Sequence, residues 1–417
     1  MKESLETAAP VPGTTSPWRG DFPVFAVTEN GKPLVYLDSA ASAQKPHQVL
    51  DAVRHFEAFE YANIHRGVYK LSETATARYE GARASVRRFL NASDDREIVF
   101  VRGTTEAVNL VARSFAKPRL APGDEILITH LEHHSNIVPW QLICAETGAE
   151  LKVAPIDARG VVDLEAFAGL LGPRTRFAAF AHVSNALGTV NPVGEMTRLA
   201  HAQGVPVLVD GAQAVAHLPV DVQEIGCDFY AFSGHKLYGP SGIGALYGML
   251  EHLEAMPPFQ GGGDMIRSVS FSGTTFAPAP QKFEAGTPNI GGAVGLGAAI
   301  EYVEAIGWEA IESHQRALQE HGEQVLASIT GLRLIGTAPE RVSLFSYVLD
   351  GVHPHDIGTF LAADNIAVRS GHHCAQPVME RFGVPATTRA SLGIYNTRSD
   401  LDALAAGLQR VKEFFAA

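Results

Sequence analysis

Val205-Pro206-Val207-Leu208-Val209-Asp210 is an almost unbroken apolar run that ends on an acidic residue, and runs of this kind decide the fold class. A strand that is apolar along its length is typical of a parallel sheet covered by helices on both faces. Six other short apolar runs predict strands at 97–101, 125–129, 151–155, 177–182, 228–232 and 242–247. Helical stretches such as 106–115 and 194–203 lie between them, as crossover helices do. We therefore predict an α/β protein with a mostly parallel central sheet and helices on both faces.

The pattern changes towards the C-terminus, where we predict a smaller α/β domain. A long helix-like region at 300–330 leads towards a strand at 341–349, and a second strand at 391–395 precedes a terminal helix. Ser399, with Asp402 three residues later, resembles a capping box at the start of that helix. The predicted organisation is a partly flexible N-terminal extension at 1–30, a large domain at 31–300 and a small domain at 301–417.

Composition limits the classes of partner. The 417 residues are 46% hydrophobic and carry a formal net charge of −12, without blocks of Lys and Arg. A nucleic acid or an anionic membrane would require a basic surface, so we expect small molecules or proteins as partners. We find no stretch that resembles a signal peptide or a membrane span. Three scattered cysteines are too few for a disulfide framework, which predicts a reducing, cytoplasmic location.

An acid and an amine follow two of the predicted strands. Asp210 ends the strand at 205–209, and Lys236 follows the strand at 228–232 within Ser233-Gly234-His235-Lys236. Because ligands of open α/β sheets bind at the carboxyl ends of the strands, both side chains are expected at one binding edge. The alternative is a simple ion pair between Asp210 and Lys236.

Gly103-Thr104-Thr105 follows the strand at 97–101 and begins a helical pattern. Such a turn offers hydroxyl and backbone N–H donors to an anion, although it is more often a plain helix cap. Next to the Ser233-Gly234-His235-Lys236 segment it suggests a phosphate site. Pyridoxal phosphate has an aldehyde for Lys236, a pyridine nitrogen for Asp210 and a phosphate for the threonines, and a lysine Schiff base with an acidic pyridinium partner is its usual setting.

Three histidines, His130, His133 and His134, follow the strand at 125–129. Metal ligation is one interpretation of them. A His-Glu-x-x-His arrangement does not occur here, so we favour an imidazole of His133 lying over a cofactor ring and predict no metal site.

Cys374 lies in the polar segment Arg369-Ser370-Gly371-His372-His373-Cys374. A thiolate is the nucleophilic form of cysteine, and cationic neighbours such as Arg369, or a protonated His372 or His373, would favour it. A structural cysteine or half of a zinc site are the alternatives, but the chain has no Cys-x-x-Cys pair. We favour a nucleophile at Cys374 and core packing for Cys144 and Cys227.

Seven segments together resemble the pyridoxal-phosphate-dependent cysteine desulfurases, in unchanged order between about residues 34 and 397. These segments are 36–42, 63–67, 103–106, 132–134, 210–213, 233–236 and 369–377. The Gly371-His372-His373-Cys374 motif is most similar to that of the Suf-system branch. This branch contains the SufS-like enzymes and also includes selenocysteine lyases. The resemblance implies the pyridoxal-phosphate fold type I.

The resemblance also implies a role for each matching residue. Lys236 would carry the cofactor and act as base, His133 would stack on the ring and assist proton transfer, and Cys374 would attack the substrate sulfur. Asp210 would hold the pyridine nitrogen and Gln213 the phenolic oxygen. Phosphate contacts are implied for Thr104, Thr105, Ser233 and His235, and for Thr287 acting across a homodimer. Substrate contacts are implied for Arg389, which would clamp the carboxylate, and for Asn185, Arg369 and His65.

The implied reaction converts L-cysteine to L-alanine and leaves a persulfide on Cys374. Its sulfur would pass to an acceptor protein of SufE or SufU type and supply iron–sulfur cluster assembly. A selenocysteine lyase or an aminotransferase-like enzyme would share Lys236, Asp210 and Arg389 without depending on Cys374. A cofactor-loaded scaffold protein is the non-enzymatic alternative, and it would have no need of these residues.

Overall fold

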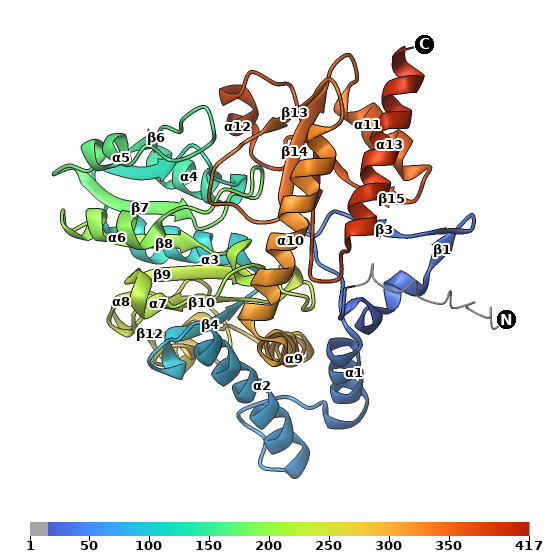
Figure 1. Ribbon diagram of the computed structural model, residues 1–417. Helices are drawn as coiled ribbons and strands as arrows, with labels where there is room; N and C mark the ends of the chain where they lie inside the picture. Colours follow the sequence, from blue (N-terminus) through green and yellow to red (C-terminus); the bar gives the residue numbers. More distant parts are fainter. Residues whose placement is uncertain (1–15, 417) are drawn as a thin grey trace.

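The computed structural model describes residues 16–416, and its centre is a sheet of seven strands (Figure 1). In spatial order the strands are β4 (Ile98–Val101), β10 (Gly244–Gly248), β9 (Phe229–Ser233), β8 (Val207–Asp210), β7 (Thr175–Ala181), β5 (Glu125–Thr129) and β6 (Glu150–Ala154). Within this sheet β10 runs antiparallel to both of its neighbours, whereas the others are parallel. The predicted α/β class and mostly parallel sheet are confirmed, with strand ends displaced by at most two residues.

Helices cover both faces of this sheet, as predicted. Successive strand residues alternate between two buried clusters, so that in β9 Phe229 and Ala231 face one cluster while Tyr230 and Phe232 face the other. The first cluster is completed by α3 (Thr104–Leu110), α4 (Val138–Thr147) and α8 (Leu250–Ala255). The second is completed by α2 (Lys70–Phe89), α5 (Leu164–Leu170), α6 (Val193–His201), α7 (Val222–Ile225) and α9 (Ile290–Ile306), and α1 (His47–His55) packs on α9.

A second sheet belongs to the C-terminal part of the chain. Its antiparallel strands are, in spatial order, β13 (Leu332–Ile335), β14 (Leu344–Leu349), β17 (Thr387–Ser391) and β16 (Arg369–Gly371). The helices that share its core are α10 (Trp308–Ala327), α11 (Pro354–Ala362) and α13 (Arg398–Ala416), and α12 (Gln376–Arg381) follows the cysteine loop. Strand β3 (Val35–Tyr36) pairs in parallel with β15 (Ile366–Ala367), which ties an N-terminal segment to this unit. The boundary at residue 300 stays a prediction.

The helix-like region predicted at 300–330 is helical, but it contains the end of α9 and the whole of α10 rather than one helix. The chain bends by 80° between α9 and α10. Gly307 lies at the bend with a φ of 86°, a left-handed value that favours glycine. A glycine within an otherwise helical pattern does not reveal from sequence alone whether the helix continues through it.

Two further predictions fail near the terminal helix. The strand predicted at 391–395 is instead a turn after β17, in which Gly393 N donates to Asn396 Oδ1 at 2.8 Å. The capping pair also lies two residues earlier than predicted. Asp400 N donates to Thr397 Oγ1 at 3.2 Å and Thr397 N donates to Asp400 Oδ2 at 3.0 Å, whereas Asp402 pairs with His321.

The predicted N-terminal extension at 1–30 lies partly outside the described residues, which begin at residue 16. Within its described part, Phe22 is buried against Tyr395 at 4.8 Å between ring centroids. Arg19 forms an ion pair with Asp400 at 2.9 Å. Residues 16–22 are thus anchored to the start of the terminal helix.

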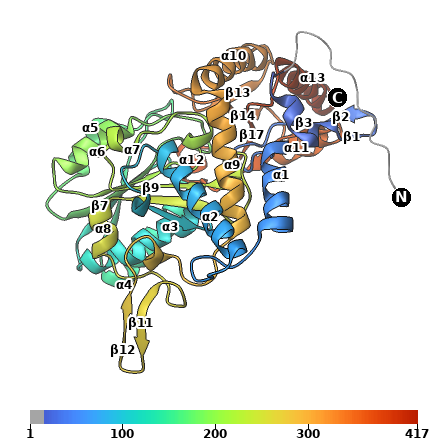
Figure 2. The same cartoon turned by 90° about the horizontal axis from the view of Figure 1, so that it is seen from below.

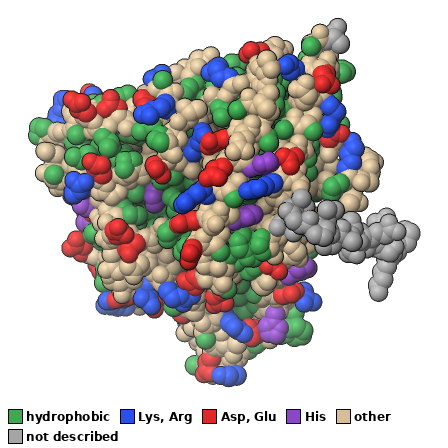
Figure 3. All heavy atoms as spheres, in the orientation of Figure 1, with side chains coloured by type: hydrophobic (Ala, Val, Ile, Leu, Met, Phe, Trp, Pro, Cys, Tyr) green, Lys and Arg blue, Asp and Glu red, His purple; other side chains and the backbone are tan. Residues whose placement is uncertain are grey.

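One hairpin projects from the body, formed by β11 (Ile266–Ser270) and β12 (Gly273–Phe276) (Figure 2). A short hairpin of β1 (Thr28–Glu29) and β2 (Lys32–Pro33) lies near the N-terminus. Among residues 16–416 no single helix is long and apolar enough to cross a membrane, and the bent pair α9–α10 passes that test only as a pair. On the face shown in Figure 3, basic and acidic side chains are interspersed and neither sign dominates a large area.

Candidate active site

Asp210 and Lys236 lie at the same edge of the large sheet, because β8 and β9 are parallel neighbours and Asp210 pairs in register with Ala231. Asp210 is buried and accepts a hydrogen bond from Ala212 N at 2.9 Å. Among the described residues, no ion pair within 4.0 Å joins Asp210 to Lys236. The alternative interpretation of these two residues as a simple ion pair is therefore wrong. Burial lowers the pKa of Lys236 to about 8, opposed by the charge of Asp210. About a tenth of the Lys236 amine is therefore neutral and nucleophilic at pH 7, far more than for an ordinary lysine.

The residues predicted to bind the cofactor phosphate lie at the ends of two strands, where the chain leaves β4 and β9. Thr104 N donates to Ser233 Oγ at 2.9 Å, and the two hydroxyls also lie 2.9 Å apart. A Cβ atom at Gly103 would come within 3.0 Å of Ser233 Oγ, so glycine permits this close approach. Burial and the nearby Lys236 lower the pKa of His235 to about 4, which keeps its imidazole neutral. The cradle thus offers hydroxyl, amide and imidazole donors to an anion.

His133 is held in one tautomer by its neighbour. Its Nδ1 accepts a hydrogen bond from Ser135 N at 3.0 Å and lies 2.7 Å from Ser135 Oγ. Burial, followed by the charge of Lys236, lowers the pKa of His133 to about 3. The imidazole is consequently neutral at physiological pH and carries its proton on Nε2.

Gln213 follows β8 three residues after Asp210. Its Nε2 donates to Ala40 O at 2.7 Å and retains a second N–H. Among the described residues no group of three or more His, Cys, Asp or Glu side chains is arranged to hold a metal ion.

The small sheet carries two of the residues predicted to contact the substrate, Arg389 and Arg369. Arg389 on β17 pairs in register with Arg369 on β16. Arg389 Nη1 donates to Asn185 O at 2.8 Å and Nη2 donates to Asp38 Oδ1 at 3.0 Å. Its Nε is buried without a hydrogen-bond partner in the described residues, as is Nδ1 of the neighbouring His373. Two unpaired buried polar atoms beside one cavity fit a site that binds a polar ligand.

Cys374 occupies a tight turn between β16 and α12. His373 and Cys374 both have a φ of 55°, a strained left-handed conformation for residues with side chains. His134 N donates to Cys374 O at 2.7 Å, and the Asn185 side chain donates to His373 O. Two adjacent carbonyls of the loop are thus held by residues that follow β5 and β7 of the large sheet. The Cys374 thiol is half-buried, whereas Cys144 and Cys227 are buried in the core, as their predicted packing role requires.

A single cavity of about 210 Å³ is lined by most of the predicted site residues. They are Thr104, Thr105, His133, Asn185, Asp210, Gln213, Ser233, His235, Lys236, Arg369, Cys374 and Arg389. His65 and Thr287 do not line it. His65 is exposed and lies 2.8 Å from Glu80, while Thr287 is exposed on the loop before α9.

The donor set of this cavity fits pyridoxal phosphate. A neutral amine suits its aldehyde, a buried carboxylate suits its pyridine nitrogen, and the Thr104 and Ser233 cradle suits its phosphate. A protonated His373, one of the predicted cationic neighbours of Cys374, is not present at neutral pH, because burial lowers the pKa of His373 to about 3. Sequence analysis did not single out Asp38, which holds Arg389, or Ser135, which lines the cavity. Each is within a segment that carries the resemblance or follows it directly, but its individual role depends on contacts between residues far apart in the chain.

Comparison with known proteins identifies the family. The family model described as aminotransferase class-V matches residues 35–404. A cysteine desulfurase of Klebsiella pneumoniae is 53% identical over 394 residues, which are 94% of this chain and 97% of that protein. A cysteine desulfurase of Synechococcus elongatus is also 53% identical over 394 residues, but this chain spans 63% of that longer relative. The crystal structure of the Escherichia coli cysteine desulfurase CsdA matches with a TM-score of 0.88 and 45% identity, covering 95% of this chain and 98% of that one.

The predicted fold type I is confirmed by these matches, since the same α/β architecture extends over nearly the whole chain. The chain belongs to the aminotransferase class-V family and, within it, to the cysteine desulfurases, which depend on pyridoxal phosphate.

Proposed function

We propose that this protein converts L-cysteine to L-alanine and collects the sulfur as a persulfide on Cys374. The observation that carries the proposal is that the Cys374 thiol, the Lys236 amine and the Arg389 guanidinium line the same cavity of about 210 Å³. Bound pyridoxal phosphate would supply an electron sink, which allows an amino acid to lose its Cα proton and its side-chain sulfur.

The two ends of the cavity have separate tasks in this proposal. Asp210, Gln213, Thr104, Thr105, Ser233 and His235 hold the cofactor. Arg389 binds the substrate carboxylate with its planar donors, and Asn185 and Arg369 line the same end. The substrate is thereby oriented with its Cα towards Lys236 and its sulfur towards Cys374.

Proton transfer is assigned to Lys236 and His133. The Lys236 amine, with a pKa of about 8, takes the Cα proton. The neutral His133 presents its Nε2–H to the reacting groups.

Sulfur transfer is assigned to Cys374. Its thiolate attacks the substrate sulfur, an S–S bond forms and the Cβ–S bond of the substrate breaks. The electron pair of the broken bond stays with the three-carbon product, which takes up a proton at Cβ, regains a proton at Cα from Lys236 and leaves as alanine.

The short cysteine loop supports transfer of the sulfur to a separate acceptor protein. The turn at 372–375 is fastened at His134 and Asn185 and connects β16 directly to α12, so Cys374 does not travel far. An acceptor protein must therefore bring its own thiol to the cavity mouth. We propose a SufE- or SufU-type acceptor and supply of sulfur to Suf-type iron–sulfur cluster assembly, in a homodimeric cytoplasmic enzyme. The free state of the three cysteines fits a reducing cytoplasm.

The experiment measures alanine released from L-cysteine and from L-selenocysteine by the wild type, Cys374→Ala and the matched control Cys144→Ala. We expect Cys374→Ala to lose alanine formation from L-cysteine while Cys144→Ala retains it. Full activity of Cys374→Ala on L-selenocysteine, without wild-type activity on L-cysteine, would instead assign a selenocysteine lyase. Such a lyase does not need Cys374, because selenide leaves more readily than sulfide.

A further inference from the structure

Glu132 is a fully buried glutamate that has no part in the chemistry assigned above. It lies in the turn between β5 and α4, directly before His133. Its carboxyl group accepts hydrogen bonds from uncharged donors only. Thr129 Oγ1 donates to Oε1 at 2.5 Å, Ala181 N donates to the same oxygen at 3.2 Å, and Asn136 Nδ2 donates to Oε2 at 2.6 Å. One side chain thus connects the two ends of its own turn to the neighbouring strand β7.

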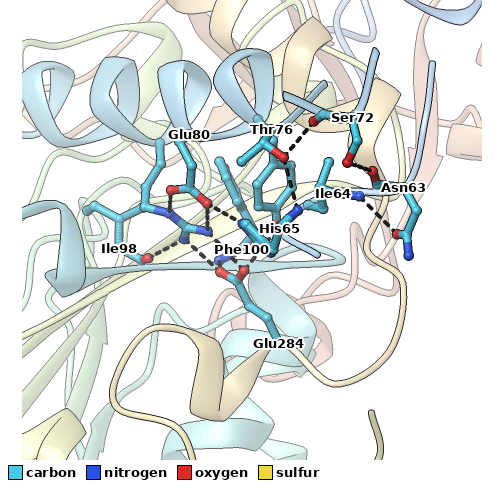
Figure 4. A network of polar contacts seen from close by, with 11 residues as sticks. Asn63, Ile64, His65, Ser72, Thr76, Glu80, Ile98, Phe100 and Glu284 are labelled. Carbon is cyan, nitrogen blue, oxygen red and sulfur yellow. Dashed lines mark hydrogen bonds and ion pairs between the residues drawn. The ribbon is translucent and has the colours of Figure 1, made fainter. Parts of the chain in front are cut away.

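A second largely buried glutamate, Glu284, is compensated by a cation (Figure 4). Arg83 Nη1 donates to Glu284 Oε1 at 2.7 Å, and Nη2 donates to Oε2 at 2.9 Å. Glu132 has no such partner, since it forms no ion pair with any of the described residues. Burial raises the pKa of Glu132 to about 8, so an ionised carboxylate is unfavourable there. Such a group costs stability, and its clearest use is to fix one arrangement of the chain.

A line of hydrogen bonds connects Glu132 to the core. Beyond Glu132, Asn136 Oδ1 accepts from Trp140 Nε1 at 2.9 Å. Trp140 on α4 is fully buried and packs against Phe177 on β7, with 5.1 Å between the ring centroids. Because both the oxygen and the nitrogen of the Asn136 amide are engaged, its side chain is held in one orientation. The packed core therefore determines how Glu132 is oriented.

The turn that Glu132 closes carries two residues that reach the active site. His133 lines the cavity. His134 holds the cysteine loop at two points, since its N donates to Cys374 O at 2.7 Å and its Nε2 accepts from Gln376 N at 3.1 Å. The turn thus contacts the loop assigned to sulfur transfer and contains the imidazole assigned to proton transfer.

We infer that Glu132 is a positioning residue for both steps: by closing the turn at 129–136, it fixes His133 in the wall of the cavity and, through His134, holds the Cys374 loop beside it. This inference rests on the proposed function. Glu132 itself does not line the cavity, and it acts only through its neighbours.

Glu132→Gln removes one acceptor with little change in the shape of the side chain. The carboxyl group offers one oxygen to Ala181 N and the other to Asn136 Nδ2, whereas the amide of glutamine has a single oxygen. Whichever way this amide is turned, its NH2 group faces one of the two donors. One contact of the turn must therefore break and leave a buried N–H donor unpaired.

A second substitution restores the match. In Glu132→Gln/Asn136→Asp, the amide oxygen at position 132 accepts from Thr129 and Ala181, while the NH2 group donates to one carboxylate oxygen at position 136. The other carboxylate oxygen still accepts from Trp140 Nε1. All four hydrogen bonds are retained although the carboxyl group has moved to position 136. The exchanged pair thereby separates positioning from a direct effect of a carboxyl group at position 132.

The test compares Glu132→Gln, the exchanged pair and the control Glu146→Gln with the wild type. Glu146 is exposed on α4, the helix that follows the turn, and pairs with Arg113 at the surface. The first readout is the rate at which iodoacetamide alkylates Cys374 in apo protein, followed by peptide mass. This rate depends on neither the cofactor nor turnover of cysteine. The second readout is kcat and KM for alanine formation from L-cysteine.

In Glu132→Gln, Cys374 should be alkylated several-fold faster, because a loosened turn no longer holds its loop. The kcat should fall roughly ten- to a hundredfold, the usual effect of misplacing a catalytic group by about 1 Å. The KM should change less, since Arg389, which is assigned to the substrate carboxylate, lies on the small sheet. The exchanged pair should recover both values, and Glu146→Gln should resemble the wild type throughout.

A wild-type alkylation rate or a wild-type kcat in Glu132→Gln would overturn the inference. An exchanged pair that keeps either defect would also overturn it, because the carboxyl group would then be needed at position 132 itself. If either altered chain does not fold, Thr129→Val, which removes the hydroxyl donor to Glu132, takes its place and must show the same two changes. If the wild type forms no alanine, the proposed function fails, whereas the alkylation rates still test how the Cys374 loop is held.

Discussion

Arg389 and Asp38 form an ion pair of 3.0 Å at the substrate end of the cavity, although 351 residues separate them in the chain. Arg389 is almost fully buried, and its remaining named partner is the Asn185 carbonyl. Burial raises the pKa of Asp38, against the opposing effect of Arg389. The pair keeps a buried guanidinium compensated and oriented before any substrate carboxylate arrives.

Asp38→Asn is expected to destabilise the protein and to loosen Arg389. The partly exposed carboxylate is one partner of a buried arginine, so its loss should reduce the free energy of unfolding by about 1–3 kcal/mol in urea denaturation. The KM for L-cysteine should rise several-fold with a smaller change in kcat. Glu304→Gln, which breaks an exposed pair, should change neither quantity measurably. An unchanged KM for Asp38→Asn would show that Asp38 has no part in substrate binding.

The pKa of Lys236 predicts how apo protein recombines with pyridoxal phosphate. Because the neutral amine attacks the aldehyde and the Lys236 pKa is about 8, the recombination rate should rise nearly tenfold per pH unit below pH 8 and level off above it. Asp210 raises the Lys236 pKa, so Asp210→Asn should move the midpoint to lower pH. Stopped-flow absorbance measures both midpoints. A wild-type midpoint near the ordinary lysine value would contradict the buried environment described for Lys236.

His133 is expected to act as a neutral group. His133→Ala should slow alanine formation by roughly a hundredfold or more, the usual contribution of a positioned proton donor. His133→Gln, which retains an N–H donor, should recover part of that rate. Since the His133 pKa lies at about 3, the wild-type rate should show no His133 titration between pH 5 and 8. A wild-type inflection near pH 6 that disappears in His133→Gln would show that the imidazole is charged in the working enzyme.

The sequence predicts the large sheet and its binding edge well, for a physical reason. Parallel strands buried on both faces have to be apolar throughout, so polar residues at their ends, such as Asp210, are conspicuous. The bend at Gly307 and the turn at Gly393 depend instead on packing between distant segments. The local pattern predicted a helix-like region without a bend at Gly307 and a strand at Gly393. Arg389 lies on strand β17 of the small sheet and Cys374 in the turn after its strand β16. Their approach to Lys236 follows only from the docking of the two sheets. Asp38 was missed for the same reason.

The most direct test of the account is intact mass measurement of the wild type and Cys374→Ala after a single turnover with L-cysteine, combined with peptide mapping of the added sulfur. The account predicts one added sulfur atom in the wild type, mapped to Cys374, together with one equivalent of alanine, and neither product in Cys374→Ala. Alanine in equal amounts from both proteins, without a sulfur adduct on Cys374, would contradict it.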